Sequence, residues 1–537
     1  MTKILNFTCG CSFKISDEEG ILFDPNINTI NLECQRTWDL ISDGNTKGCF
    51  QLESRLGRSY AKKLKPENIE QLSALIAIIR PGCLESFKDG KSITQHYIDI
   101  KNGLESIDYL HPALEPVLKT TYSQMIYQEQ AMQIAKDIAG FSLQDADSLR
   151  KAIGKKLPEQ MAKLKTKFIE GCKNAQIVDP DTAEQIFGWI EKSQRYSFNK
   201  SHSVSYAINA YLSAYTKAHF TKVFFASYLS FAKDKPNPQD EIKELIQNAN
   251  AMDVQVRTPD LRNLNRFFIL KDDTIYFGLT DIKGLGQSVF DKIVKLATDS
   301  HINMKNTYWL QILFKLLINI NSVAAKALIQ SGAVDFTGLA RQKMLYEYNT
   351  ISNLTKKELE FCLANLSDKV DLYYILQTLL YKHKISKNRK ANIENLLYNL
   401  HNPPHSLDDQ LEWIADCEFN LLGYSLSCSR VDLYDISMTN TSCREFNAGA
   451  SNKNIILGGE ITGLNITQTK TGQAKGADMA FVTLQDNSGS CDSVIFFPET
   501  YKKYRNILFS GNVIIVQGNR SKNRDSLVVE KTYVART

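Results

Sequence analysis

The stretch MAFVTLQDNSGSCDSVIFF, residues 479–497, decides the fold of the C-terminal part of the chain. Two runs of alternating apolar and polar residues flank the turn-forming tetrapeptide DNSG. Similar runs precede it in IILGGEITGLNITQTKTG (455–472) and follow it in NVIIVQGNR (512–520) and SLVVEKTYV (526–534). About five short strands within roughly 85 residues predict a small closed barrel of the oligonucleotide-binding type.

The pattern upstream of this barrel is mostly helical. EQAMQIAKDIAG reads as a helix that stops at Gly140, and DPDTAEQIFGWIEKSQ as a helix capped by Asp179 or Asp181. Residues 268–294 predict a short hairpin through Asp272 and Asp273 and then a helix entered through the tight turn KGLG. The first 30 or so residues predict a small β-hairpin. The expected fold class is therefore multidomain α+β, mainly helical, with a C-terminal five-stranded barrel.

Charge and cysteine content narrow the class of protein. The 537 residues carry a net charge of +5, and 147–222 hold 13 Lys and Arg against 7 Asp and Glu, as expected for a segment with a phosphate-rich partner. Eleven scattered cysteines indicate thiols in a reducing compartment. With no signal peptide pattern and no long apolar run, we expect a cytoplasmic protein without a membrane partner.

LRKAIGKK, residues 149–156, gathers four cations around a helix end. Arg and Lys side chains there suit a polyphosphate, since Arg presents a planar fork and Lys a mobile point charge. A plainer interpretation also fits: Asp147 pairs with Lys151 at i,i+4, and lysines suit the negative end of a helix dipole. The residues themselves leave both interpretations open.

YSFNKSH, residues 196–202, places four consecutive polar residues beside aromatic ones. Such a turn suits contacts to phosphates or a base, with Tyr196 or Tyr206 available for stacking. A solvated helix cap has the same composition. In the barrel, 11 Lys and Arg oppose 7 Asp and Glu, and four aromatics are candidates for stacking on bases or for the core: Phe481, Phe496, Phe497 and Tyr501.

Metal sites are not expected in this chain. Asp145 with Asp147 and Asp179 with Asp181 are carboxylate pairs, but their spacing fits helix starts and caps better than a two-metal centre. Four cysteines offer thiolates that could bind zinc: Cys9, Cys11, Cys34 and Cys49. The one-residue gap between Cys9 and Cys11 is narrower than the gap of two to four residues in most structural zinc sites. The turn IKGLGQ matches a helix-hairpin-helix, whose backbone amides contact DNA phosphates non-specifically, and offers Lys283, Gly284 and Gly286 as DNA-binding residues.

Many long motifs in this order resemble the family C replicative DNA polymerases of bacteria, the alpha subunits of DNA polymerase III. The similarity is carried by TKGCFQLES (46–54), ALIAIIRPGCLES (74–86), YQEQAMQIAKDIAGFSLQDADSLRKAIGKK (127–156), YSFNKSHSVSYAINAYLSAYTKAHF (196–220), IYFGLTDIKGLGQ (275–287), ALIQSGAVDFTGLARQKML (327–345), DCEFNLLGYSLS (416–427) and MAFVTLQDNSGSCDSVIFFPETY (479–501). It covers roughly residues 31–537, more loosely between about 345 and 410.

The resemblance implies roles for individual residues. It implies that the fingers bind the triphosphate of an incoming dNTP through Arg150, Lys151, Lys155, Lys156 and Arg80. It implies a second group that lines the nucleotide and template: Gln128, Glu129, Asn199, Lys200, Ser201 and His202. The implied domains are an N-terminal hairpin extension (1–30), fingers (31–235), a helix-hairpin-helix region (236–345), a helical connector (346–450) and an OB-fold domain (451–537).

The family also implies parts that the motifs do not show. Its PHP and palm domains precede the fingers, and the palm supplies three aspartates for two Mg²⁺ ions, so no catalytic residue is expected here. We expect the fingers-bearing part of a split DNA polymerase, viral or bacterial, acting on template-primer DNA and dNTP with a palm-bearing polypeptide that holds Mg²⁺. The alternatives are a catalytically inactive DNA-binding accessory and an incomplete product without activity. QILFK (311–315) is a weak candidate for binding a sliding clamp.

Overall fold

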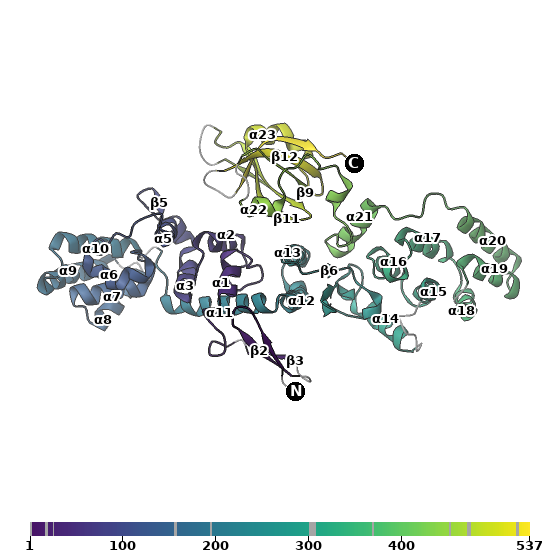
Figure 1. Ribbon diagram of the computed structural model, residues 1–537, viewed down its shortest axis with the longest axis horizontal. Coiled ribbons are helices and arrows are strands. Elements are labelled where there is room, and N and C mark those ends of the chain that lie inside the picture. Colours follow the sequence, from purple (N-terminus) through teal and green to yellow (C-terminus); the bar gives the residue numbers. More distant parts are fainter. Residues whose placement is uncertain are drawn as a thin grey trace. The chain divides into compact units, whose positions relative to one another are not determined.

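The computed structural model describes residues 3–16, 20–24, 26–154, 158–193, 196–299, 308–367, 370–449, 453–469, 474–521 and 526–536. The chain divides into two compact units, Met1–Thr221 and Lys222–Thr537 (Figure 1). Within the described ranges, no helix is long and apolar enough to cross a lipid bilayer.

The first unit opens with a small antiparallel sheet in the order β1-β2-β3, where the sequence pattern predicted a two-stranded hairpin. The strands are β1 (Lys3–Asn6), β2 (Ser12–Ser16) and β3 (Gly20–Leu22). Between β1 and β2 the chain turns tightly, because the Phe7 amide donates to the Cys11 carbonyl at 2.9 Å and the Gly10 amide to the Phe7 carbonyl at 3.0 Å. Gly10 has φ +82°, a conformation that glycine adopts without strain.

A buried helix forms the centre of the first unit. Eight of the ten residues of α3 (Ile69–Ile78) are buried, and the helix packs against α11 (Lys200–His219). The chain then turns at Arg80, the N-cap of α4 (Pro81–Leu84), where Pro81 needs no amide hydrogen bond. The surrounding helices are α1 (Gln35–Ser42), α2 (Arg55–Leu64) and α5 (Ile93–Lys101), whereas Leu118 of α6 (Glu115–Leu118) is buried in the core of the helices that follow.

Four further helices share their own core: α7 (Gln128–Ala139), α8 (Leu143–Gly154), α9 (Pro158–Ala175) and α10 (Pro180–Ser193). Phe141, Phe168 and Phe187 are among the residues buried between them. The ends follow the predicted signals. Gly140 closes α7 in the left-handed region at φ +67°, and Asp179 accepts from the Thr182 amide at 2.9 Å to cap α10.

The second unit begins with helices α12 (Thr221–Phe231) and α13 (Pro238–Ala251), followed by a hairpin of β7 (Ile269–Lys271) and β8 (Thr274–Tyr276). Asp272 and Asp273 form its two-residue turn with φ of 48° and 66°, as the sequence predicted. The helices after this hairpin are α14 (Gln287–Asp299), α15 (Trp309–Asn319), α16 (Ser322–Gln330), α17 (Arg341–Ile351), α18 (Lys356–Ala364), α19 (Leu372–Lys382), α20 (Lys387–His401) and α21 (Leu411–Leu422).

The sequence QILFK does not present a clamp-binding peptide in this fold. Its residues lie within α15, and Ile312, Leu313 and Phe314 are 3%, 0% and 0% exposed in the core of the second unit. An apolar side chain that is already buried cannot enter a partner's groove. The helical periodicity of WLQILFKLLIN, rather than the five letters QILFK, explains these residues.

The C-terminal barrel confirms the predicted fold class. It is closed in the order β10-β11-β13-β12-β9, with β11 and β13 parallel and the other pairs antiparallel. The strands are β9 (Ile455–Gln468), β10 (Asp478–Asp486), β11 (Gly489–Phe496), β12 (Val513–Arg520) and β13 (Leu527–Val534). Alternation along β10 turns Ala480, Val482 and Leu484 inward and leaves Phe481 on the outer face.

Candidate nucleotide and DNA interface

A short β-bridge joins two of the motifs that the sequence singled out. Tyr127 and Phe198 pair in parallel, so that the Gln128 amide donates to the Phe198 carbonyl at 2.9 Å and the Phe198 amide to the Ile126 carbonyl at 2.8 Å. Because α7 begins at Gln128 and α11 at Lys200, the bridge places the N-termini of both helices side by side. Backbone amides at such ends favour anionic groups.

Glu129 fastens the second motif to the first. Its carboxylate accepts from Asn199 Nδ2 and from the Lys200 amide, both at 2.9 Å. Asn199 in turn caps α11, since its Oδ1 accepts from the His202 amide at 2.8 Å and from Ser201 Oγ at 2.7 Å. These contacts make Glu129 and Asn199 positioning residues, with Ser201 and His202 exposed beyond them.

Two cations border this cluster. Lys200 Nζ lies 3.2 Å from Glu70 Oε1, whereas the guanidinium of Arg80 lies 4.2 Å from the centre of the Phe198 ring. Arg80 is exposed and forms no ion pair with the described residues. Its guanidinium nitrogens can therefore meet a phosphate without first breaking a salt bridge.

A row of partly exposed rings continues from Phe198 along α11. The His202 ring lies 5.5 Å from Phe198 and 4.1 Å from Tyr206, and Tyr206 lies 5.1 Å from Phe50. Tyr206 was a predicted stacking residue, but Phe50 was not. Phe50 is 40% exposed and lies in the motif TKGCFQLES. The sequence alone did not show that this phenylalanine would lie beside Tyr206 of α11, because the contact forms only through the fold.

Arg150 and Lys151 converge on one carboxylate. Arg150 Nη2 lies 2.8 Å from Asp147 Oδ1, and Lys151 Nζ lies 2.7 Å from Asp147 Oδ2. These contacts hold the pKa of Asp147 below its usual value, with the Lys151 hydrogen bond as the main cause. The plainer interpretation of LRKAIGKK, a helix-end ion pair, is thus present in the structure, and no contact ties either cation to the Asn199 cluster within the described residues. Lys155 and Lys156 lie outside the described residues.

One member of each carboxylate pair weighed as metal ligands, Asp145 or Asp179, contacts the start of a helix instead. Asp145 accepts from Ser142 Oγ and from Lys167 Nζ, both at 2.6 Å, and these contacts lower its pKa to about 2. Asp179 caps α10. The Gln128 side chain forms no hydrogen bond within the described ranges, so it remains available at the mouth of the cluster.

The KGLG turn in the second unit is exposed and well anchored. Gly284 has φ +93° and Leu285 is 3% exposed, so the buried leucine fixes the turn while the glycines face solvent. The Lys283 amide donates to the Leu421 carbonyl at 2.9 Å and is therefore occupied. The Lys283 side chain and the two glycine amides are the groups that can meet a DNA phosphate.

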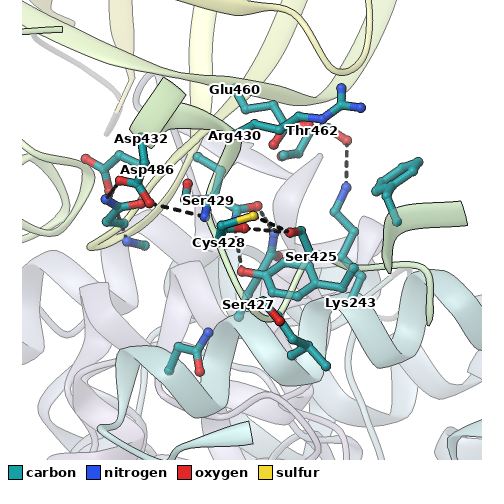
Figure 2. A pocket seen from close by; sticks show the side chains of 18 of the residues that line it. Lys243, Ser425, Ser427, Cys428, Ser429, Arg430, Asp432, Glu460, Thr462 and Asp486 are labelled. Carbon is teal, nitrogen blue, oxygen red and sulfur yellow. Dashed lines mark hydrogen bonds between the residues drawn. The ribbon is translucent and has the colours of Figure 1, made fainter. Parts of the chain in front are cut away.

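A cavity of about 360 Å³ lies where the barrel meets α13 and the segment that follows α21 (Figure 2). Lys243 Nζ donates to the Thr462 carbonyl at 3.3 Å, and Gln485 Nε2 donates to Tyr424 Oη at 2.7 Å. Burial lowers the pKa of Lys243 and raises that of Glu460. The polar side chains that line this cavity mainly contact one another. We therefore interpret them as the packing contact between the barrel and the helices rather than as a reactive centre.

Two family models match the chain and define its class. Residues 12–176 match the bacterial DNA polymerase III alpha subunit finger domain, and residues 253–344 match a helix-hairpin-helix motif. The chain is therefore built from polymerase finger and helix-hairpin-helix modules. The finger match begins at residue 12, earlier than the first matching sequence motifs indicated, so most of the N-terminal sheet belongs to the matched region.

Curated relatives match most of the chain. The chain is 33% identical to the DNA polymerase III subunit alpha of Pseudomonas aeruginosa, over 93% of this chain and 41% of that protein. It is 31% identical to the same subunit of Aquifex aeolicus, over 94% and 39%, and 29% identical to that of Escherichia coli K12, over 92% and 41%. The chain is thus similar, over more than nine tenths of its length, to bacterial DNA polymerase III alpha subunits, and it spans about two fifths of the length of these relatives.

Proposed function

We propose that this chain binds an incoming dNTP and template-primer DNA as the fingers-bearing part of a replicative DNA polymerase. The observation that carries the proposal is the cluster at the paired N-termini of α7 and α11, within a chain that matches the finger domain. Exposed Arg80 and the neighbouring row of rings suit a nucleotide with both phosphates and a base.

Arg150 and Lys151 complete the proposed triphosphate site. In the nucleotide-bound state they leave Asp147 and neutralise phosphate oxygens. Breaking the ion pairs with Asp147 costs little free energy, because the Arg150 and Lys151 side chains are 40% and 60% exposed. Ion pairs at the surface contribute only about 0–1 kcal/mol. The chain would then supply positioning and preorganised positive charge to nucleotidyl transfer.

Mg²⁺ does not fit the described residues. Among them, the one group of three or more candidate ligands holds cysteines and a histidine, whereas Mg²⁺ prefers oxygen ligands. We therefore propose that a palm-bearing polypeptide holds the metal ions and joins this chain in the cytoplasm of a bacterial or phage-infected cell. No step of the reaction is assigned to a metal in this chain.

The test joins a native pull-down with kinetics. The tagged chain is recovered from its own cells, and primer extension is measured for wild type and Arg150→Ala. We expect a palm-bearing polypeptide to co-purify and the KM for dNTP to rise about 10- to 100-fold, since a hydrogen bond to a charged group contributes about 1.5–3 kcal/mol. DNA binding without dNTP should persist.

Two further variants sharpen this test. Lys165→Ala removes a similar surface ion pair, to Glu184 at 2.5 Å in the same helical cluster, and should leave the KM unchanged. Asp147→Asn releases both cations and should lower the KM up to about fivefold. If the chain is recovered without a palm-bearing polypeptide and binds single-stranded DNA with no nucleotide dependence, it is an accessory DNA-binding protein.

A further inference from the structure

The fold brings together four metal-ligating side chains from three distant parts of the sequence. The ligand atoms of Cys9, Cys11, Cys34 and His219 all lie within 4.8 Å of one another. His219 Nε2 lies 3.3 Å from Cys9 Sγ and 3.8 Å from Cys34 Sγ. Cys34 is 1% exposed, and Cys11 and His219 are each 6% exposed. We propose that these four residues bind a structural zinc ion.

The separations suit a tetrahedral site. With Zn–S bonds of about 2.3 Å and a Zn–N bond of about 2.0 Å, ligand atoms at tetrahedral angles stand about 3.5–3.8 Å apart. The observed separations bracket these values, so small side-chain adjustments close the shell. Three thiolates and an imidazole in such a shell favour zinc over cations that prefer oxygen ligands.

Each ligand is held by a defined backbone element. Cys9 and Cys11 flank Gly10 in the turn between β1 and β2, where φ +82° lets both sulfurs reach one point. Cys34 is the N-cap of α1. His219 is the last residue of α11. Figure 1 shows the small sheet beside this helix.

The second ring nitrogen of His219 is already oriented. Nδ1 lies 2.9 Å from the Tyr215 carbonyl, so it carries the proton and leaves Nε2 as the acceptor that faces the sulfurs. The rings of Phe7 and Phe13 lie 4.9 and 5.5 Å from His219 and exclude water from one side. This is the arrangement expected of a metal-binding histidine.

Charge at the site is also compensated. Zinc with three thiolates and a neutral imidazole carries one net negative charge. Arg36 Nε donates to the Ala218 carbonyl at 2.8 Å, next to His219, and the guanidinium lies 5.4 Å from the centre of the Phe7 ring. A cation thus stands beside the cluster without occupying it.

The consequence is mechanical rather than catalytic. A zinc ion would fasten the N-terminal sheet and the start of α1 to the end of α11, the helix whose opposite end carries Asn199 and Lys200. It would stabilise the frame of the nucleotide site without touching a substrate. Cys34 and His219 are 185 residues apart in the sequence. A zinc ion bound to both would therefore close a long loop of the chain.

Zinc content of the purified full chain tests the proposal. We expect one zinc per chain, and loss of that zinc in Cys11→Ser and His219→Ala. Cys49→Ser is the matched control: Cys49 is a fully buried cysteine of the same unit that lies outside the cluster, and its replacement should leave zinc bound. Wild type without zinc after purification in zinc-containing buffer, or variants that keep it, would overturn the proposal.

Cobalt substitution of the wild-type chain keeps the test informative if the variants fail to fold. Tetrahedral Co²⁺ with thiolate ligands gives intense visible bands and a sulfur-to-metal charge-transfer band, whereas weak octahedral bands would contradict the site. Chelation should increase hydrogen exchange in residues 3–16 and near residue 219 and leave the barrel unchanged. A disulfide among Cys9, Cys11 and Cys34 in the native chain, detected by mass spectrometry, would also overturn the proposal.

Discussion

The carboxyl of Asp281 contributes a pH dependence to the stability of the second unit. Asp281 Oδ2 is buried and finds no hydrogen-bond donor among the described residues. Burial raises the pKa of Asp281 to about 7, and Lys233 opposes the shift. A Cβ at Gly278 would stand 2.2 Å from this oxygen, so the glycine makes room for it. The protonated acid is therefore the form that the fold accommodates.

The sign of the pH dependence follows from the raised pKa. The folded state binds the proton more tightly than the unfolded chain, so stability is full below about pH 4 and is lost as pH rises to about 7. The total loss is about 4 kcal/mol at most. We expect Asp281→Asn to abolish a decrease of about 2–3 kcal/mol between pH 5 and 8 in urea unfolding. Asp273→Asn, with a side chain 84% exposed, should retain it.

At the level of elements, one buried arginine connects α16, α17 and α21. Arg341 is 2% exposed, with Nη2 2.6 Å from Asp335 Oδ2 and Nη1 2.9 Å from Glu418 Oε1. The other Glu418 oxygen accepts from the Leu426 and Ser427 amides. Every charge in this network has a partner, so the network is stable only when it is complete.

Replacing the arginine should therefore be costly. Arg341→Met leaves the buried Glu418 without its cation, and we expect the free energy of unfolding to fall by about 3–5 kcal/mol. Arg444→Met is the control, because Arg444 is 57% exposed and 3.9 Å from its partner Asp253; its effect should stay below about 1 kcal/mol. Denaturant unfolding measures both. Equal losses in the two variants would show that burial does not govern these ion pairs.

Local signals explain which elements could be predicted from the sequence. The turn at Asp272 and Asp273, the stop at Gly140 and the cap at Asp179 depend on neighbours within a few residues, and alternation predicted the barrel. The sequence placed Cys49 with the other cysteines, whereas the fold brings His219 there. Spacing cannot reveal a ligand that arrives through tertiary packing.

The candidate site shows the same limit. The FNKSH and YQEQ motifs were recognised by their resemblance to a family, but the bridge from Tyr127 to Phe198 that unites them is a long-range contact. Asp147 at i,i+4 from Lys151 was a local expectation and the structure has that ion pair. The prediction that QILFK binds a clamp was wrong, because a five-residue motif does not show whether its apolar side chains are buried. Composition likewise could not separate surface aromatics from core ones: Phe496 is fully buried, Tyr501 packs on the core, and Phe497 is 45% exposed.

For the whole molecule, the two units predict two separable functions. The residues proposed to bind the nucleotide lie in Met1–Thr221, whereas the KGLG turn and the barrel lie in Lys222–Thr537. In oligonucleotide-binding barrels the face of the second and third strands contacts the bases. Phe481 lies on the outer face of β10, paired with Asn465 of β9 and Ile495 of β11. A half-buried ring on this outer face can stack on a base of single-stranded DNA.

We expect Phe481→Ala to weaken binding of single-stranded DNA by about 5- to 100-fold, because stacking on one base contributes about 1–3 kcal/mol. The KM for dNTP at saturating DNA should not change, since Phe481 belongs to the second unit and the residues proposed to bind the nucleotide belong to the first. Phe509→Ala is the matched control, because Phe509 is 55% exposed but stands outside β10 and β11. Fluorescence anisotropy at several salt concentrations measures the affinity. Because stacking carries no charge, the salt dependence should be the same in wild type and variant, and a changed slope would instead indicate lost phosphate contacts.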